Sequence, residues 1–149
     1  MKVSLENIDR ENFHDVIELE VEPSQEDNLP SNVYSIAEST LSPLFHPRAI
    51  CVEGAVKGFV MYQFGVPGTD NADKCTIWRF MVDRRFQNTG IGKRAMRRLL
   101  DEIKAHQCCS QVEIYYDPEY AVAKKLYARF GFRVVGVRDD GDVIAERPI

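Results

Sequence analysis

The hydrophobic and polar positions of the chain divide it into short apolar runs and longer amphipathic segments. Runs that alternate with polar residues, or that glycine and proline bound, predict strands, and apolar residues three or four positions apart predict helices. The predicted strands span residues 3–8, 49–53, 56–62, 75–82, 111–116, 133–138 and 142–147. The predicted helices run from Asp9 to Val21 and then over residues 33–41, 93–104 and 119–130.

This order of elements predicts an α+β fold, in which a mixed, mostly antiparallel twisted sheet is flanked by helices. No repeat, low-complexity tract or long linker divides the sequence, so we expect residues 1–149 to form a single domain. The acidic, turn-rich segment 22–30 is expected to be a loop, and Pro43 and Pro47 are expected to bracket a short connection. Asp9 is the expected N-cap of the first helix.

The composition narrows the class of protein. The hydrophobic share of 44% is typical of a globular chain. No apolar run approaches the roughly 20 residues of a membrane-spanning helix, and the N-terminus lacks the apolar core of a signal peptide. We therefore expect a cytoplasmic protein with no membrane partner. The cysteines form no C-x-x-C pair and the histidines are scattered, so we expect free thiols and no metal site.

The net charge of −4 hides an uneven distribution of charged residues. Residues 1–75 carry 13 acidic and 5 basic side chains, whereas residues 76–149 carry 10 acidic and 14 basic ones. Six basic residues and no acidic one lie between Arg84 and Arg98. This local excess suits a polyanionic ligand, although on its own it more often means a solvated helix face. Because the chain is acidic overall, we expect no nucleic-acid partner.

A turn with two glycines joins the predicted strand 75–82 to the basic helix; its sequence is Gln87-Asn88-Thr89-Gly90-Ile91-Gly92. The free amides and the dipole of a first helical turn bind anions, and glycine lets a phosphate approach the backbone. Ala95 ends the spacing of a dinucleotide-binding G-x-G-x-x-G motif, and Arg94 excludes a G-K-[ST] P-loop. The turn therefore predicts a pyrophosphate site of a different kind.

Two motifs together resemble the GNAT superfamily of N-acetyltransferases. The stretch from Val82 to Gly92 resembles its acetyl-CoA signature, V-x-x-x-x-[QR]-x-x-G-x-[GA]. The stretch from Leu126 to Phe132 resembles its second signature, L-Y-x-x-x-G-F. The motifs stand in the family's order, and the predicted elements fit the family along nearly the full chain. Segments such as 78–83 and 58–62 are most similar to bacterial polyamine acetyltransferases.

The resemblance implies an N-acetyltransferase whose central strands splay apart to bind acetyl-CoA. Tyr127 takes the position of the catalytic acid that protonates the leaving thiolate; without the motif it would be interpreted as a core residue. The resemblance implies that Arg84, Arg85 or Arg94 contacts the 3′-phosphate. The backbone of Phe80, Met81 and Val82 is expected to pair with the pantetheine arm. The pyrophosphate is expected to lie against Gln87, Asn88, Thr89, Gly90, Ile91, Gly92 and Lys93.

The acceptor follows less directly from the resemblance. Polyamine acetyltransferases often carry acidic residues in the middle of the strand 75–82, where this chain has Trp78 and Arg79. Tyr120 stands where many relatives have an asparagine. Acidic residues elsewhere are candidates for attracting or deprotonating an amine: Glu20, Glu22, Glu26, Asp27 and, on a neighbouring strand, Glu113. We expect the acceptor to be a small cationic amine such as a polyamine, in contact with Glu20, Glu22, Trp78 and Arg79.

Three alternatives stay open at this stage. The acidic N-terminal segment could instead be a solvated loop, which for any single one of its carboxylates is the commoner situation. The same fold could acetylate a protein N-terminus or lysine, or could bind CoA as a regulator without catalysis. The sequence also leaves open whether the chain forms a homodimer.

Overall fold

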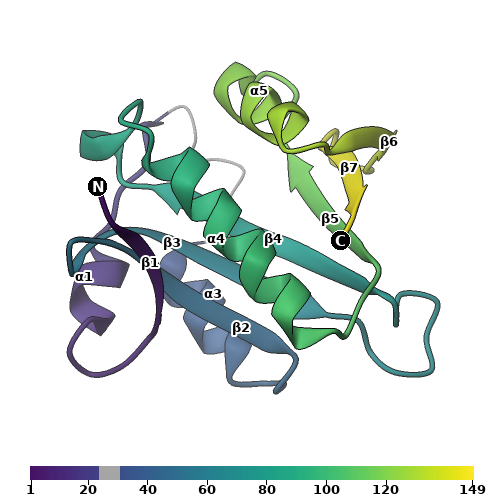
Figure 1. The fold of residues 1–149 in the computed structure, drawn as a ribbon, viewed down its shortest axis with the longest axis horizontal. Coiled ribbons are helices and arrows are strands. Elements are labelled where there is room, and N and C mark those ends of the chain that lie inside the picture. Colours follow the sequence, from purple (N-terminus) through teal and green to yellow (C-terminus); the bar gives the residue numbers. More distant parts are fainter. Residues whose placement is uncertain (24–30) are drawn as a thin grey trace.

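The computed structural model describes residues 1–23 and 31–149, which form a sheet with helices on both faces (Figure 1). The strands are β1 (Val3–Asn7), β2 (Phe45–Val52), β3 (Ala55–Phe64), β4 (Lys74–Val82), β5 (Gln111–Tyr116), β6 (Arg133–Val137) and β7 (Val143–Pro148). The helices are α1 (Phe13–Ile17), α3 (Asn32–Ser39), α4 (Ile91–His106) and α5 (Ala121–Arg129), with a short 3-10 helix, η1 (Arg84–Phe86).

The sheet has the strand order β1-β2-β3-β4-β5-β7-β6. Every neighbouring pair is antiparallel except β4 and β5, which are parallel because α4 crosses between them. The structure thus confirms the predicted α+β fold with a mostly antiparallel sheet.

Two hydrophobic cores lie on opposite faces of this sheet. Helices α4 and α5 cover one face, where Met96, Leu99 and Ile103 of α4 are fully buried (Figure 1). Helices α1 and α3 cover the other face, against a smaller core that includes Phe59 and Met81. Because successive residues of a strand point to opposite faces, β4 contributes to both cores: Cys75 and Ile77 lie in the first and Met81 in the second.

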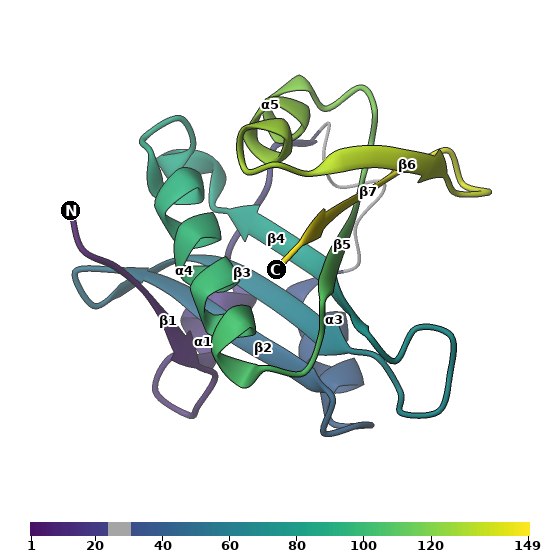
Figure 2. The ribbon, with the colours of Figure 1, turned by 45° about the vertical axis from the view of Figure 1, so that its right-hand side comes forward.

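The parallel pair β4 and β5 stays together for only part of its length. It pairs from Lys74 opposite Gln111 to Ile77 opposite Ile114, and no pairing follows. Trp78 interrupts the register between β4 and β3, since Tyr62 pairs with Ile77 and Met61 pairs with Arg79. Beyond this bulge the two strands diverge (Figure 2). The splay that the family resemblance implied is therefore present.

The first helix is shorter than predicted. It ends at Ile17, although Val21 was expected within it. The amide of Glu20 instead donates to Oδ2 of Asp83 (3.1 Å), and the amide of Arg84 donates to the carbonyl of Glu20 (2.7 Å). These long-range bonds replace the helical ones. The Asp9 carboxylate accepts from two amides of a turn before the helix, whose N-cap is Asn12.

Pro47 lies inside β2 and not in a connection, which corrects the sequence-based expectation. Strand β1 pairs with β2 only as far as Arg48, so Pro47 stands where β2 has no partner on that side. A missing amide hydrogen is tolerated at such an edge position. No helix among the described residues is long and apolar enough to cross a membrane.

Candidate active site

A buried carboxylate organises the connection from β4 to α4. Asp83 is 1% exposed, and its Oδ1 accepts from the amide (3.0 Å) and Nε (2.8 Å) of Arg85. Burial alone would raise the pKa of Asp83, but these bonds and the one from the amide of Glu20 lower it. The carboxylate therefore stays ionised and holds η1 and the end of the α1 segment together.

The N-terminus of α4 is left open for an anion. Its N-cap is Gly90, with φ of 89°, and no side chain accepts from the first-turn amides. The first turn contains no acidic residue, and Lys93 is exposed beside it. The amides of Ile91, Gly92 and Lys93 precede the first helical hydrogen bond, from Arg94 to Gly90. Free amides, a helix dipole and a lysine suit a phosphate group.

One cavity reaches this helix end; we call it the turn cavity. It is lined by β4 residues 80–82, by Phe86, Gln87, Asn88 and Gly92, and by Val21 and α5. Gly92 leaves room there, since its nearest neighbours would lie 3.8 Å or more from an added Cβ. The Gln87 side chain donates to the carbonyl of Val82 (3.0 Å), so that carbonyl has one protein partner.

A second cavity, the strand-gap cavity, fills the space where β4 and β5 diverge. It encloses about 210 Å³. Its walls are formed by residues 77–80 of β4, residues 114–117 at the end of β5, the start of α5 and Asp142. This is room for several water-sized groups, and therefore for a small amine. The two cavities share four lining residues and so meet there: Phe80, Tyr120, Ala123 and Tyr127.

Tyr127 is held at this junction by packing. It is 6% exposed, and its ring contacts those of Tyr116 (5.3 Å between centroids) and Phe132 (6.0 Å). Among the described residues, its hydroxyl forms no hydrogen bond. Burial, with smaller contributions from Tyr120 and Tyr116, raises the pKa of Tyr127 far above its usual value. The phenol therefore keeps its proton at neutral pH and can donate it.

Trp78 and Arg79 both line the strand-gap cavity, as their place on the central strand predicted. Trp78 is 37% exposed and donates from Nε1 to the side chain of Gln63 (2.8 Å). Arg79 is 5% exposed and donates from Nε to Oδ1 of Asn32 on α3 (3.1 Å). Burial lowers the pKa of Arg79 to about 10.

Three carboxylates line the same cavity on the β5 side: Asp117, Glu119 and Asp142. Burial raises the pKa of Asp142, and Asp140 and Asp117 raise it further against a smaller opposing effect of Arg138. The sequence analysis named none of these residues as a site residue, and Asp142 was predicted only as the first residue of the strand 142–147. The Asp117-Pro118-Glu119 segment directly after β5 was a usable signal, since the carboxyl end of a parallel strand at a chain crossover commonly faces a ligand.

The predicted acidic residues of the N-terminal part lie differently. Glu20 forms an ion pair with Arg84 (3.0 Å) and lines neither cavity described above. Burial raises the pKa of the Tyr120 hydroxyl, and the nearby charge of Glu22 raises it further. Glu26 and Asp27 lie outside the described residues. Glu113 lines neither cavity and, together with burial, raises the pKa of Tyr115 to about 12.

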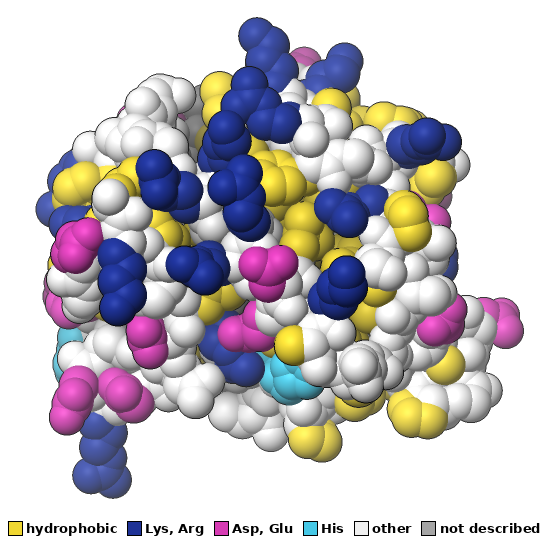
Figure 3. Space-filling model, in the orientation of Figure 1, with side chains coloured by type: hydrophobic (Ala, Val, Ile, Leu, Met, Phe, Trp, Pro, Cys, Tyr) yellow, Lys and Arg dark blue, Asp and Glu magenta, His cyan; other side chains and the backbone are white. Residues whose placement is uncertain are grey.

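The basic residues near the turn are partly engaged by the protein. Arg85 pairs with Asp83 and Arg84 with Glu20, and Arg94 donates to the carbonyl of Met1 (3.2 Å). Figure 3 shows Lys and Arg side chains gathered over α4 and α5, with hydrophobic side chains visible between them. Residues 1–23 and 31–149 contain no cluster of three or more His, Cys, Asp or Glu side chains arranged for a metal ion.

Known proteins are similar to this chain in sequence or in fold. The chain is 23% identical over 141 residues to the spermine/spermidine N(1)-acetyltransferase of Bacillus subtilis, covering 93% of each protein. Its fold matches the PaiA N-acetyltransferase of Thermoplasma acidophilum in complex with coenzyme A (TM-score 0.76, 16% identity, 100% of both chains). It also matches the aminoglycoside acetyltransferase AAC(6′)-Ib in complex with coenzyme A (TM-score 0.79, 15% identity, 99% of this chain and 95% of that one).

A family model describes most of the chain. The model of the acetyltransferase (GNAT) family matches residues 6–132, which include β4, the glycine turn and Tyr127. The sequence motifs, the divergence of β4 from β5 and the family model thus agree, and the chain belongs to the GNAT family of acetyltransferases.

Proposed function

We propose that the protein transfers the acetyl group of acetyl-CoA to the primary amine of a small cation, such as a polyamine. The observation that carries this proposal is the meeting of two cavities at Tyr127. One cavity leads to the open N-terminus of α4, and the other is lined by carboxylates.

The turn cavity is the proposed site of coenzyme A. The amides from Gln87 to Gly92 and the Lys93 side chain would hold the pyrophosphate. The backbone of β4 from Phe80 to Val82 has no strand partner on the side from which β5 has diverged, and it would pair with the pantetheine arm. The thioester would then lie at the junction beside Tyr127.

The strand-gap cavity is the proposed site of the amine. An alkyl ammonium has a pKa near 10.4 and must lose a proton before it attacks. Carboxylates at Asp117, Glu119 and Asp142 would attract the cation, and Asp142, whose raised pKa makes it the stronger base, would accept the proton.

The chemistry then needs no covalent enzyme intermediate. A bond forms between the amine nitrogen and the acetyl carbon, and the bond from that carbon to sulfur breaks. The ammonium gives one proton to Asp142 before the attack. The departing thiolate receives a proton from Tyr127, and the second proton that the nitrogen loses as the amide forms restores the phenol. Holding the two reactants together supplies much of the rate. The similarity to a protein named spermine/spermidine N(1)-acetyltransferase supports an amine of this class.

A panel of acceptors tests the proposal through release of the CoA thiol. We expect turnover with polyamines and diamines and little with neutral monoamines. Asp142→Asn should lower kcat/KM for diamines by about tenfold or more, within the range of a lost general base. Asp139→Asn, an exposed position on the same turn that lines neither cavity, is the control. Turnover confined to peptides, or to no amine at all, would refute the proposal.

A further inference from the structure

Arg79 is a buried cation, and residues 1–23 and 31–149 supply no counterion to it. Among the described residues, no carboxylate lies within ion-pair distance of its guanidinium, and its one hydrogen bond goes to Asn32. The Nη1 nitrogen is buried and finds no hydrogen-bond partner in the part of the chain that the structure describes. Burial lowers the pKa of this guanidinium to about 10. An isolated charge is costly to remove from water, so a fold rarely keeps one without a use.

Other arginines of the described core and turn each form an ion pair with a carboxylate. Arg48, which is also largely buried, pairs with Glu102 (3.2 Å). Arg84 and Arg85 pair with Glu20 and Asp83 although both are more exposed. Within the described residues, the lack of an ion-pair partner at Arg79 is thus a property of that position and is not shared by these other arginines.

The position faces the proposed amine site. Arg79 lines the strand-gap cavity and directly precedes Phe80, which lies where the two cavities meet. Asn32 accepts from Nε of the guanidinium, and Nη1 has no partner among the described residues. The opposite side of the cavity carries Asp117 and Asp142. The cavity therefore offers a cation on one wall and carboxylates on the other.

We propose that the acceptor is a basic amino acid, whose carboxylate pairs with Arg79 while its ammonium groups face the carboxylates of the opposite wall. A guanidinium matches a carboxylate in shape and can donate two parallel hydrogen bonds to it. Arg79 would determine specificity and take no part in proton transfer. This inference rests on the proposed acetyl transfer to an amine and names the class of that amine.

Two pairs of amines differ only by the carboxylate: ornithine and putrescine, and lysine and cadaverine. We measure binding of each by calorimetry to the protein saturated with CoA, and acetylation of each with acetyl-CoA. The wild type should prefer the amino acid of each pair by about tenfold or more, and ornithine amide, which lacks the charge, should behave as putrescine does. Equal binding of ornithine and its amide by the wild type overturns the proposal without any variant.

Two variants place the preference on Arg79. Arg79→Gln should reduce the preference for ornithine over putrescine to within about threefold, and Arg79→Lys should retain part of it. Arg133→Gln, at an exposed position on the outer strand β6, should leave it unchanged. Because each ratio is taken within one protein preparation, partial unfolding cancels. A preference that survives in Arg79→Gln would contradict the proposal.

The assay separates this inference from the proposed function. Tight, Arg79-dependent binding of ornithine without acetylation would leave the carboxylate site standing and refute the acetyl transfer. Acetylation of putrescine and spermidine at least as fast as of ornithine would support the transfer and refute the carboxylate site. A peptide with a free C-terminal carboxylate, added as a further ligand, distinguishes a free amino acid from a chain end.

Discussion

Tyr127 shows how a single residue can be placed by packing alone. Its ring packs against those of Tyr116 and Phe132. No hydrogen bond from the described residues positions its hydroxyl. Removing the hydroxyl therefore deletes a proton donor and leaves the packing in place. This allows the chemical role of the residue to be separated from its structural role.

For Tyr127→Phe we expect kcat to fall by about 100-fold or more, the range observed for a lost general acid. The dissociation constant of CoA and the thermal midpoint should change little, because the substitution removes a single oxygen atom that forms no hydrogen bond within the described residues. Single-turnover kinetics and calorimetry measure the two quantities separately. If kcat falls by less than threefold, another group protonates the thiolate.

For Arg79 we expect a substitution to increase stability. Arg79→Met removes a buried charge that no described carboxylate pairs with, and we expect the free energy of unfolding to rise by about 1 kcal/mol or more. Arg48→Met breaks the ion pair with Glu102 and should lower it by at least about 1 kcal/mol. Urea denaturation of both variants checks the contrast. A loss of stability in Arg79→Met would mean that its charge is balanced within the protein.

The N-terminus of α4 is the element in which local structure and ligand binding are most closely joined. Gly90 adopts a left-handed conformation that a side chain would strain. Gly92 lies within the first turn, and an added methyl would make ordinary contacts at 3.8 Å with Leu126 and 3.9 Å with Val82. The two glycines should therefore respond differently to the same substitution.

Gly92→Ala should stabilise the helix slightly, by up to about 0.5 kcal/mol, and weaken CoA binding by about tenfold, because the methyl enters the turn cavity. Gly90→Ala should lower the free energy of unfolding by roughly 1–2 kcal/mol. Calorimetric titration with CoA and urea denaturation of both variants provide the test. If CoA binds Gly92→Ala as tightly as the wild type, the pyrophosphate does not lie against this turn.

The sequence predicted the elements of the sheet well and their ends less well. Hydrophobic patterns report burial, and so they located β4, β5 and α4. They could not show that Asp83, far from Glu20 in sequence, would end α1 early, because that depends on a tertiary hydrogen bond. Asp142 was missed for the same reason: only the pairing of β5 with β7 brings its turn to the cavity. A motif located Tyr127, whose proposed role no periodicity would have indicated.

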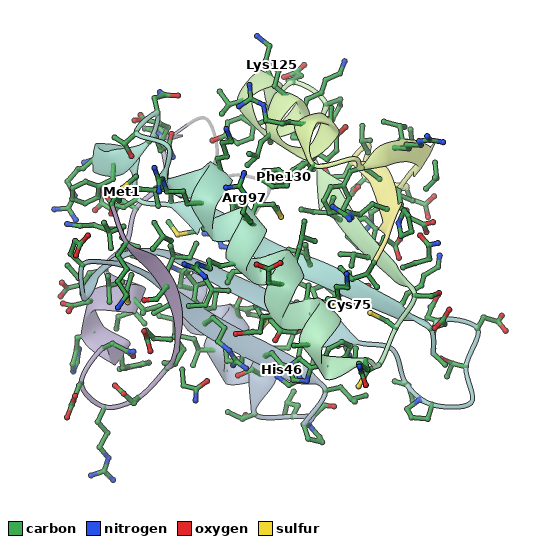
Figure 4. The ribbon with its side chains drawn as sticks, in the orientation of Figure 1. Met1, His46, Cys75, Arg97, Lys125 and Phe130 are labelled. Carbon is green, nitrogen blue, oxygen red and sulfur yellow. The ribbon has the colours of Figure 1, made fainter. Side chains whose placement is uncertain are left out.

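At the scale of the whole molecule, the proposed active site and an ionisable cluster lie at opposite ends of α4. In Figure 4, Met1 lies by the N-terminal end of α4 and His46 by its C-terminal end, whereas Lys125 points outward from α5. The His46 ring stacks on Tyr62 (4.9 Å between centroids) and lies 5.1 Å from that of His106. Tyr62 in turn donates to Glu102, which also pairs with Arg48. A change of charge here would act on stability and not on the proposed chemistry.

Burial, followed by the charges of Arg48 and His106, lowers the pKa of His46 against a smaller opposing effect of Glu102. A histidine with a lowered folded pKa stays neutral in the fold while the unfolded chain takes up a proton. The contribution of His46 to the free energy of unfolding should therefore be complete above about pH 7. The free energy should fall as the pH drops through 6.5 towards the folded pKa. His46→Gln should flatten this slope between pH 7.5 and about 5.5, whereas His14→Gln, at an exposed position on α1, should keep it. Urea midpoints across this range measure the slope, and an equal slope in wild type and His46→Gln would assign it to other groups.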